Sequence, residues 1–321
     1  MAGLPANELF SELLGQPQAV ALLQASLERQ HLAPAYLFAG PDGVGRRLAA
    51  HRFLEGIVAS RQGSAALRRR LEEGNHPDLL WVEPSYQHQG RLVPASKALE
   101  EGVNRRSAPQ LRLEQVREVS RFLARRPLEC EHCLVVLEGA EFMAEAAANA
   151  LLKTLEEPGE GILILICAAP DRLLTTILSR CQRIPFTRLS ADLMARVLER
   201  HGVDPAQDPL EVRELAAGSP GALLRHRQHW EALPEGMADR LLRLEADPLA
   251  ALGLARDLCE VLDGEEQLWL LDWWQLALWR RHRLEGQARR IEHLRSQLCA
   301  YVQPRLAWEV ALLELSGVMA A

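Results

Sequence analysis

Residues 40–47, GPDGVGRR, have the glycine spacing of a phosphate-binding loop but not its chemistry. Four residues separate Gly40 from Gly45, as in the pattern G-x-x-x-x-G-K-[ST], in which backbone N–H groups hold the phosphates of a nucleotide. In that pattern a lysine contacts the β- and γ-phosphates and the next residue supplies a hydroxyl to Mg²⁺. Arg46 and Arg47 stand in those two places. The stretch is therefore a working nucleotide site, a defective one, or an ordinary turn before a helix.

The two arginines have different consequences for a nucleotide. Gly43 and the two flanking glycines could still form the backbone cradle, and Arg46 keeps a positive charge, although a planar guanidinium does not replace the point charge of lysine. Arg46 alone is weak evidence, because only two of the 37 lysines and arginines in this chain are lysines. Arg47 has no hydroxyl and brings a second cation to the place of the metal.

The elements on both sides of the loop are those that a phosphate-binding loop requires. The apolar run PAYLFAG (34–40) predicts a buried strand, and RRLAAHRFLEGIVAS (46–60) predicts a helix. A further helix is expected over 16–30, where apolar residues recur at helical spacing.

Strands and helices alternate along the chain as far as residue 187. Buried strands are expected within 76–84, 133–140 and 161–169, and amphipathic helices within 111–127 and 144–158. Residues 60–75 are polar and either helical or irregular, and 85–110 predict an exposed loop. This order predicts an α/β domain with a parallel sheet covered on both faces.

Beyond residue 187 the pattern becomes wholly helical. Ser190 is a candidate N-cap for a helix ending near Gly202, and short helices surround the turn GSPG at 218–221. Five of the seven tryptophans lie between Trp269 and Trp308, in long helices with periodic apolar residues. The pair Trp273–Trp274 indicates packing in a core or an interface; the alternative is an exposed patch for stacking nucleic-acid bases.

Composition sets broad limits on function. With 48% hydrophobic and 25% charged residues the chain has a globular composition, and a net charge of −6 argues against a generally basic nucleic-acid surface. No apolar run approaches a membrane span and the first residues do not resemble a secretion signal, so we expect a cytoplasmic protein without membrane contact. The six cysteines are expected to be reduced. CEHC at 130–133 lacks the second pair that a zinc site would need, and we expect no metal.

Two further stretches, NALLKTLEEP (149–158) and LLTTILSRCQRIPF (173–186), resemble the bacterial sliding-clamp loader family, a branch of the AAA+ ATPases. The resemblance covers the N-terminal two-thirds of the chain and includes HPDL at 76–79. It implies an AAA+ domain over 1–187, a helical lid domain over 188–232 and a helical collar, or oligomerisation domain, over 233–321. Many relatives carry a four-cysteine zinc module just before HPDL; residues 60–75 contain no cysteine, which again predicts no zinc.

The resemblance also shows which catalytic groups of the family are missing. Active AAA+ members end the strand equivalent to LVVL in Asp-Glu, where the Asp holds Mg²⁺ through water and the Glu positions the attacking water; here Glu138 and Gly139 occupy those positions. The polar sensor after the next strand would fall at Ala168 and Ala169, and the sensor arginine near GSPG is replaced by Pro220 and Gly221. Together with Arg47, these losses predict a subunit that does not hydrolyse ATP.

The triplet Ser179–Arg180–Cys181, in contrast, predicts a contribution to ATP hydrolysis at another subunit. In the family it carries an arginine finger that reaches into the ATP site of the adjacent subunit, where a guanidinium stabilises the charge of the transferred phosphoryl group. The alternative is a local salt bridge of Arg180.

Lys153 and its neighbours on the predicted helix, Thr154, Glu156 and Glu157, allow two interpretations. The first is an ordinary surface ion pair between the lysine and one of the glutamates. The second is a helix face that lies near DNA or packs against a neighbouring subunit.

A defective nucleotide site beside an intact arginine triplet is similar to the delta-prime type of subunit in the DNA polymerase III clamp loader. That resemblance implies a rigid stator in a hetero-pentameric ring with gamma/tau ATPase subunits and a delta subunit, which loads the sliding clamp onto primed DNA. The subunit would need no cofactor of its own, since neighbouring subunits bind the ATP. Two alternatives stay open: an ATP-hydrolysing gamma/tau-type motor subunit, and a non-catalytic DNA-binding scaffold with an AAA+ shell.

Overall fold

The computed structural model describes residues 6–58, 65–103, 108–157, 159–282, 285–300 and 302–317. Its centre is a five-stranded, wholly parallel sheet in the order β2-β5-β6-β1-β7. The strands are β1 (Ala35–Ala39), β2 (Leu79–Val82), β5 (Leu134–Glu138), β6 (Ile162–Cys167) and β7 (Gln182–Pro185). The predicted α/β class and parallel sheet are confirmed. The fifth strand, β7, is an addition, because the stretch around QRIP was not recognised as a strand.

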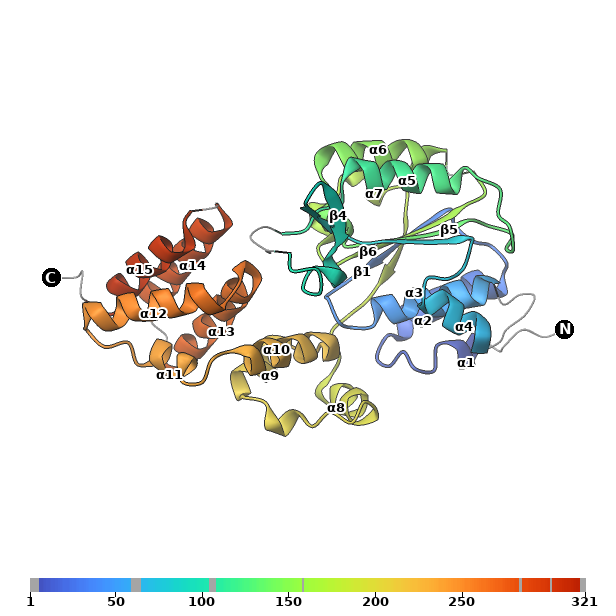
Figure 1. Cartoon of the computed structure of the whole chain (residues 1–321). Coiled ribbons are helices and arrows are strands. Elements are labelled where there is room, and N and C mark those ends of the chain that lie inside the picture. The colour runs from blue at the N-terminus through green and yellow to red at the C-terminus, as the bar shows by residue number, and fades with distance from the viewer. Residues whose placement is uncertain are drawn as a thin grey trace. The chain divides into compact units, whose positions relative to one another are not determined.

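Helices cover both faces of this sheet (Figure 1). One face carries α2 (Pro17–Glu28), α3 (Arg46–Val58) and α4 (Ala65–Glu72), with the short α1 (Ala6–Leu9) beside them. The other face carries α5 (Leu113–Leu123), α6 (Glu145–Glu156) and α7 (Thr175–Leu178). Helix α4 lies in the stretch 60–75 expected to be helical or irregular, of which 60–64 are outside the described residues.

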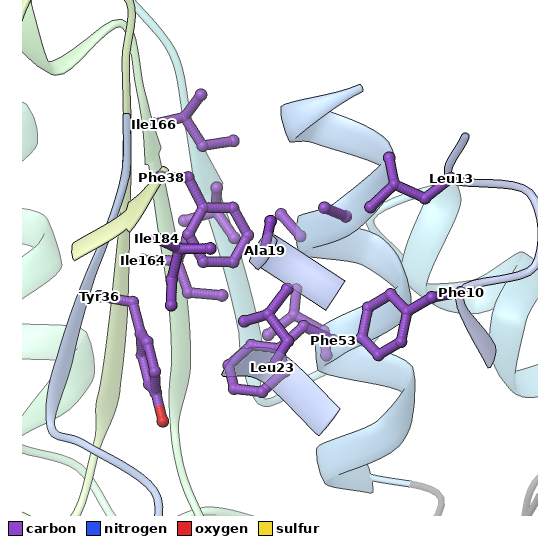
Figure 2. Packing of buried hydrophobic residues seen from close by; sticks show 14 of the residues in the cluster. Phe10, Leu13, Ala19, Leu23, Tyr36, Phe38, Phe53, Ile164, Ile166 and Ile184 are labelled. Atoms are coloured by element: carbon purple, nitrogen blue, oxygen red, sulfur yellow. The ribbon is translucent and has the colours of Figure 1, made fainter. Parts of the chain in front are cut away.

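Alternate side chains of each central strand enter two separate cores, as the period of a strand requires. Tyr36 and Phe38 of β1 pack with Ile164 of β6 against α2 and α3, as Figure 2 shows. Leu37 and Leu165, on the opposite face, pack against α5 and α6. Because both faces are buried, these strands read as continuous apolar runs.

The prediction of an exposed loop over 85–110 is wrong for the first part of that stretch. Residues Ser85–His88 (β3) and Arg91–Pro94 (β4) form an antiparallel hairpin, followed by a 3₁₀ turn at Ala95–Lys97. Gln89 and Gly90 both have positive φ, at 49° and 80°, as a two-residue hairpin turn requires. Cross-strand partners Tyr86 and Val93 are buried, which stabilises the hairpin despite its polar composition. Residues 104–107 of the predicted loop lie outside the described residues.

The chain separates into two compact units, the first made of residues 1–97, 109–203 and 218–221 and the second of 98–108, 204–217 and 222–321. Helix α8 (Ala191–Arg200) belongs to the first unit, and the hydroxyl of Ser190 accepts the N–H of Leu193, so the predicted N-cap is confirmed. The remaining helices are α9 (Leu210–Ala216), α10 (Pro220–Ala232), α11 (Met237–Leu242), α12 (Pro248–Val261), α13 (Gly264–His282), α14 (Glu285–Cys299) and α15 (Pro304–Leu315). Short 3₁₀ turns occur at Ala140–Phe142, Pro170–Arg172 and Pro205–Gln207. The sequence-based division at 187/188 and 232/233 stays a prediction.

The tryptophan pair lies inside the second unit. Trp273 and Trp274 are buried, and the Trp274 indole N–H donates to the carbonyl of Leu241 at 3.1 Å. Trp274 also stacks on Trp308. The pair is therefore core, and the alternative of an exposed stacking surface is wrong for these two residues. Among the described residues, no helix combines the length and apolarity needed to cross a membrane.

Candidate functional site

The glycine loop joins β1 to α3, as a phosphate-binding loop does, and its shape requires its glycines. Gly40, Gly43 and Gly45 all have positive φ, at 155°, 73° and 101°. A Cβ on Gly40 would lie 2.2 Å from the carbonyl oxygen of Phe186 in the segment after β7. The neighbouring backbone therefore leaves no room for a side chain at Gly40.

Arg46, in the lysine position, turns inward. Its side chain is 6% exposed and pairs with Asp42 of the same loop. The Nε and Nη1 groups of Arg46 are buried without a hydrogen-bond partner in the described part of the chain. The first of the two arginines thus keeps its charge inside the loop, with part of that charge balanced by Asp42.

Arg47, in the hydroxyl position, is 57% exposed and reaches across to the end of β5. Its Nη1 lies 3.4 Å from Oε2 of Glu138, and its guanidinium lies over the ring of Trp81 at 5.1 Å. The Trp81 indole N–H donates to the same Glu138 oxygen at 3.0 Å. Glu138, the carboxylate that would face the metal, is therefore neutralised by an arginine of its own chain.

His51, one turn further along α3, completes this group. Its ring stacks on Trp81 with centroids 4.4 Å apart. Burial, together with the charge of Arg47, lowers the pKa of His51 to about 4. The imidazole is neutral at pH 7, so Arg47 is the cation that balances Glu138.

The position of the catalytic glutamate is closed to a side chain. Gly139 has φ of 63°, and a Cβ there would lie 2.7 Å from Cγ of Pro84. A carboxylate at this position would strain the backbone and displace the proline. The missing base is therefore a property of the local fold as well as of the residue type.

The first predicted sensor position also lacks a side-chain donor. Ala168 and Ala169 follow β6, and the N–H of Ala168 donates to Oε1 of Glu141 at 3.0 Å. Burial and the neighbouring Glu141 carboxylate raise the pKa of the Cys167 thiol to about 12. One oxygen of this carboxylate therefore binds the backbone at the end of β6.

The second sensor position, in the turn at 218–221, lies directly on the glycine loop. The Ser219 hydroxyl donates to the Asp42 carbonyl at 2.5 Å, and the Gly221 N–H donates to the Gly43 carbonyl at 3.0 Å. A Cβ on Gly221 would lie 2.7 Å from Cα of Gly43. Pro220 and Gly221 thus bring backbone, not an arginine, against the loop.

The arginine triplet lies at the end of α7, on the side of the sheet covered by α6. The Arg180 side chain is 36% exposed; its Nη1 donates to the Thr176 carbonyl at 3.1 Å and its Nη2 to Oε1 of Glu156 at 2.9 Å. Ser179 donates its hydroxyl to the same carbonyl at 3.1 Å. Burial raises the pKa of the Cys181 thiol to about 12, which keeps it neutral. The local salt bridge considered as an alternative for Arg180 is therefore present.

The predicted face of α6 divides into two kinds of contact. The Thr154 hydroxyl hydrogen-bonds the Ser120 hydroxyl of α5 at 2.7 Å, so it joins the two helices. Lys153, Glu156 and Glu157 are exposed. Glu156 pairs with Arg180, and no ion pair of Lys153 occurs within the described ranges, so the interpretation of a pair between this lysine and either glutamate is wrong for the described chain.

The CEHC stretch joins a buried polar group. Cys130, His76 and Asp78 place ligand-type atoms within 4.8 Å of one another. Asp78 already accepts three backbone N–H groups, from Leu128, Glu129 and Cys130, at 2.6–2.8 Å. Burial alone would raise the pKa of Asp78, but these donors outweigh it and lower that pKa. Asp78 therefore has a structural function, because its carboxylate holds the loop before β5.

Several of these contacts were not anticipated from the sequence. The roles of Trp81, Glu141 and Ser219 depend on partners distant along the chain, and no local motif marks them. The pairing of Glu156 with Arg180 was also missed, although both residues had been singled out separately. The only available signal was that both stand in motifs shared with one family.

Family models match most of the chain. One described as "DNA polymerase III, delta subunit" matches residues 15–190, and one described as "Cyanobacterial DNA polymerase III delta prime, C-terminal domain" matches residues 192–315. A solved DNA polymerase III gamma-subunit-related protein from Thermotoga maritima superposes with a TM-score of 0.51, covering 93% of this chain and 98% of that one. At 15% identity this likeness shows the fold alone.

Curated relatives agree with the family models. DNA polymerase III subunit delta' of Pseudomonas aeruginosa is 32% identical over 263 residues, which cover 76% of this chain and 71% of the relative. The delta' subunit of Bacillus subtilis is 32% identical over 59% of this chain, and the match spans about half of that protein, 53%. A tau/gamma subunit of Haemophilus influenzae is 27% identical over 67% of this chain and 29% of its own length. With an AAA+ sheet, the arginine triplet that follows α7 and these matches, the chain belongs to the delta-prime family of DNA polymerase III clamp-loader subunits.

Proposed function

We propose that this protein is the non-hydrolysing stator subunit of a sliding-clamp loader and supplies Arg180 in trans to the ATP site of a neighbouring subunit. The observation that carries the first half of this proposal is the contact between Arg47 and Glu138. It joins the two positions that would hold Mg²⁺, one from each side of the nucleotide site, in a single ion pair.

Hydrolysis at the chain's own loop would need three things that these residues do not supply. The metal would have to displace Arg47 from Glu138, against the repulsion of a guanidinium. The attacking water would lack a base at Gly139, which costs roughly 10²–10⁴-fold in rate. No polar side chain at Ala168 or Ala169 would face the γ-phosphate. We therefore propose that the protein has no nucleotide or metal cofactor of its own, zinc included, and that ATP is bound by its neighbours.

The exposure and contacts of Arg180 support the second half. Only one N–H of each terminal nitrogen is used, by Thr176 and Glu156, so the Nε–H and one N–H on each Nη have no partner among the described residues. These are the donors that a guanidinium presents to a phosphoryl group. The local salt bridge therefore uses one N–H group of the Arg180 guanidinium, and the N–H groups without a partner remain available to a phosphoryl group bound by the neighbouring subunit.

The partners follow from the family. The relatives are named as delta', gamma and tau subunits of DNA polymerase III, and we propose a hetero-pentameric ring with gamma/tau ATPases and a delta subunit, joined through the helices of the second unit as a collar. The ring would load the sliding clamp onto primed DNA in the cytoplasm. The exposed Lys153 on α6 would face DNA or a neighbouring subunit in this assembly.

The experiment that tests the proposal is Arg180→Ala in a loader reconstituted with its ATPase subunits. Turnover at the site that Arg180 faces should fall by roughly 10³-fold or more, because the transition state loses its guanidinium. Assembly, measured by gel filtration, should be unchanged. Arg172→Ala, an exposed arginine in the preceding 3₁₀ turn, is the matched control. An unchanged rate for Arg180→Ala in the intact complex would instead favour the non-catalytic DNA-binding scaffold.

The second candidate, a gamma/tau-type motor subunit, is favoured by one observation, the intact positive-φ glycines of the loop. It requires tight binding of Mg·ATP by the isolated chain. Calorimetry and a turnover assay with the purified protein distinguish the two functions. A motor subunit binds nucleotide with a Mg-dependent heat and hydrolyses ATP. A stator shows neither the heat of binding nor the hydrolysis.

A further inference from the structure

Glu156 is the last residue of α6, a position that does not suit a carboxylate. The C-terminus of a helix carries partial negative charge, so an acidic side chain there is unfavourable for the helix itself. Lys153 lies one turn back on the same helix, yet Glu156 pairs with Arg180, which follows α7, at 2.9 Å. The carboxylate therefore serves the contact between α6 and α7 at the expense of its own helix.

The contact constrains Arg180 in a specific way. Thr176 binds Nη1 from within α7, and Glu156 binds Nη2 from α6, so the guanidinium is held at both terminal nitrogens. An arginine at a helix end that is 36% exposed would otherwise sample many rotamers. Two anchors on different helices fix the plane of the fork while its other N–H groups remain available.

We infer that Glu156 is a positioning residue for Arg180, which it orders in advance of engagement with the neighbour's nucleotide. This inference rests on the proposed function of Arg180 in trans. A catalytic arginine that is already oriented loses less rotamer freedom when the transition state forms, so its contribution appears in kcat. Glu156 does not itself approach the phosphates, where a carboxylate would repel them.

The size of the effect is limited by exposure. Glu156 is 54% exposed, and an ion pair in water is weak. We expect Glu156→Ala to lower kcat of the clamp- and DNA-stimulated ATPase of the reconstituted loader by about 2- to 5-fold, with KM for ATP unchanged. Glu156→Gln keeps an oxygen acceptor for Nη2, and its kcat should lie between those of the wild type and Glu156→Ala. Added salt should reduce the difference in kcat between Glu156→Ala and the wild type, because it screens the ion pair between Glu156 and Arg180.

Glu157→Ala is the matched control, because Glu157 is an exposed carboxylate at the same helix end without contact to Arg180. It should leave kcat unchanged. Equal melting temperatures of the two alanine variants would separate positioning from a loss of fold.

A double-mutant cycle distinguishes a failure of this inference from a failure of the proposed function. Single-turnover rates with Arg180→Ala should be the same whether residue 156 is Glu or Ala, because Glu156 acts through the arginine. The inference is overturned if Glu156→Ala slows both backgrounds equally, leaves kcat unchanged, or raises it. If Arg180→Ala itself has no effect, the proposed function fails instead, so the two failures are distinguishable.

Discussion

At the scale of single residues, the glycine loop differs from a phosphate-binding loop through pairing as well as through substitution. Arg47 brings a cation to the place of a metal, and Glu138 retains the carboxylate that such a metal would need. Arg47 would repel a metal and Glu138 would attract one, and in the ion pair their charges neutralise each other. Trp81 contacts both and fixes their separation.

Restoring the loop residues should therefore not restore hydrolysis. In the double variant Arg46→Lys, Arg47→Thr, the lysine and the hydroxyl return, but Gly139 still offers no base and Ala168 no sensor. Steady-state phosphate release from the isolated protein should remain at background. The loss of stability from Arg47→Thr alone should be below about 1 kcal/mol, since the side chain is 57% exposed. Measurable turnover would mean that the base comes from a residue other than the one at position 139.

At the scale of elements, the glycine loop is held by three segments that meet it from different parts of the chain. The segment after β7 approaches Gly40, and the turn at 218–221 donates two hydrogen bonds to the loop carbonyls of Asp42 and Gly43. Gly45 has Leu13 against it, 2.6 Å from the position of a Cβ. The loop is thus held by protein contacts on each side.

Two helical glycines provide a matched test of this packing. Gly221→Ala places a methyl group 2.7 Å from Cα of Gly43, and we expect it to destabilise the protein by about 1–3 kcal/mol. Gly253→Ala in α12 meets nothing within 4 Å and should stabilise it by about 0.5–1 kcal/mol through helix propensity. Urea denaturation of both variants measures the difference. If both substitutions change the free energy of unfolding by the same amount in the same direction, the close contact between the turn at 218–221 and the glycine loop does not affect stability.

At the scale of the whole molecule, two partly buried histidines make folding stability depend on pH. His51 stacks on Trp81, and His226 accepts the indole N–H of Trp269 at 3.1 Å. Burial is the largest cause that lowers each pKa to about 4, with the nearby charges of Arg47 and Arg225 acting in the same direction. Below pH 6.5, their ordinary pKa, the unfolded chain takes up protons that the native chain does not.

Stability should therefore fall as the pH drops from about 6.5 toward 4, and change little from these groups above 6.5. His51→Phe keeps an aromatic ring for stacking and removes one of the two groups. We expect its melting temperature to be close to that of the wild type at pH 7.5 and to decline less steeply on acidification. His201→Gln, at an exposed position after α8, should leave the slope unchanged. If His51→Phe leaves the dependence of melting temperature on pH unchanged, His51 does not contribute to the pH dependence of stability.

Much of the fold could be predicted because its signals are local. Continuous apolar runs such as LVVL and ILILIC predict strands buried on both faces, and the helices between them follow from the spacing of their apolar residues. The hairpin at 85–94 was missed because its strands are short and polar. It is stabilised by contacts that form on folding, among them the burial of Tyr86 and Val93 and the backbone hydrogen bonds between Ser85 and Gln110. β7 was missed because a four-residue strand at a sheet edge has no periodicity of its own.

The residue types at the expected nucleotide-site positions were determined by the sequence alone, because a side chain that lacks a hydroxyl or a carboxylate lacks it in any conformation. Arg47, Gly139 and the alanines after β6 needed no coordinates to be recognised. The choice of partners was decided only by the tertiary structure. Ser219 binds the carbonyl of Asp42 across 177 positions, and Arg180 binds Glu156 across 24. Hydrogen bonds and ion pairs form between groups that folding brings within a few ångströms, and separation along the chain does not specify that distance.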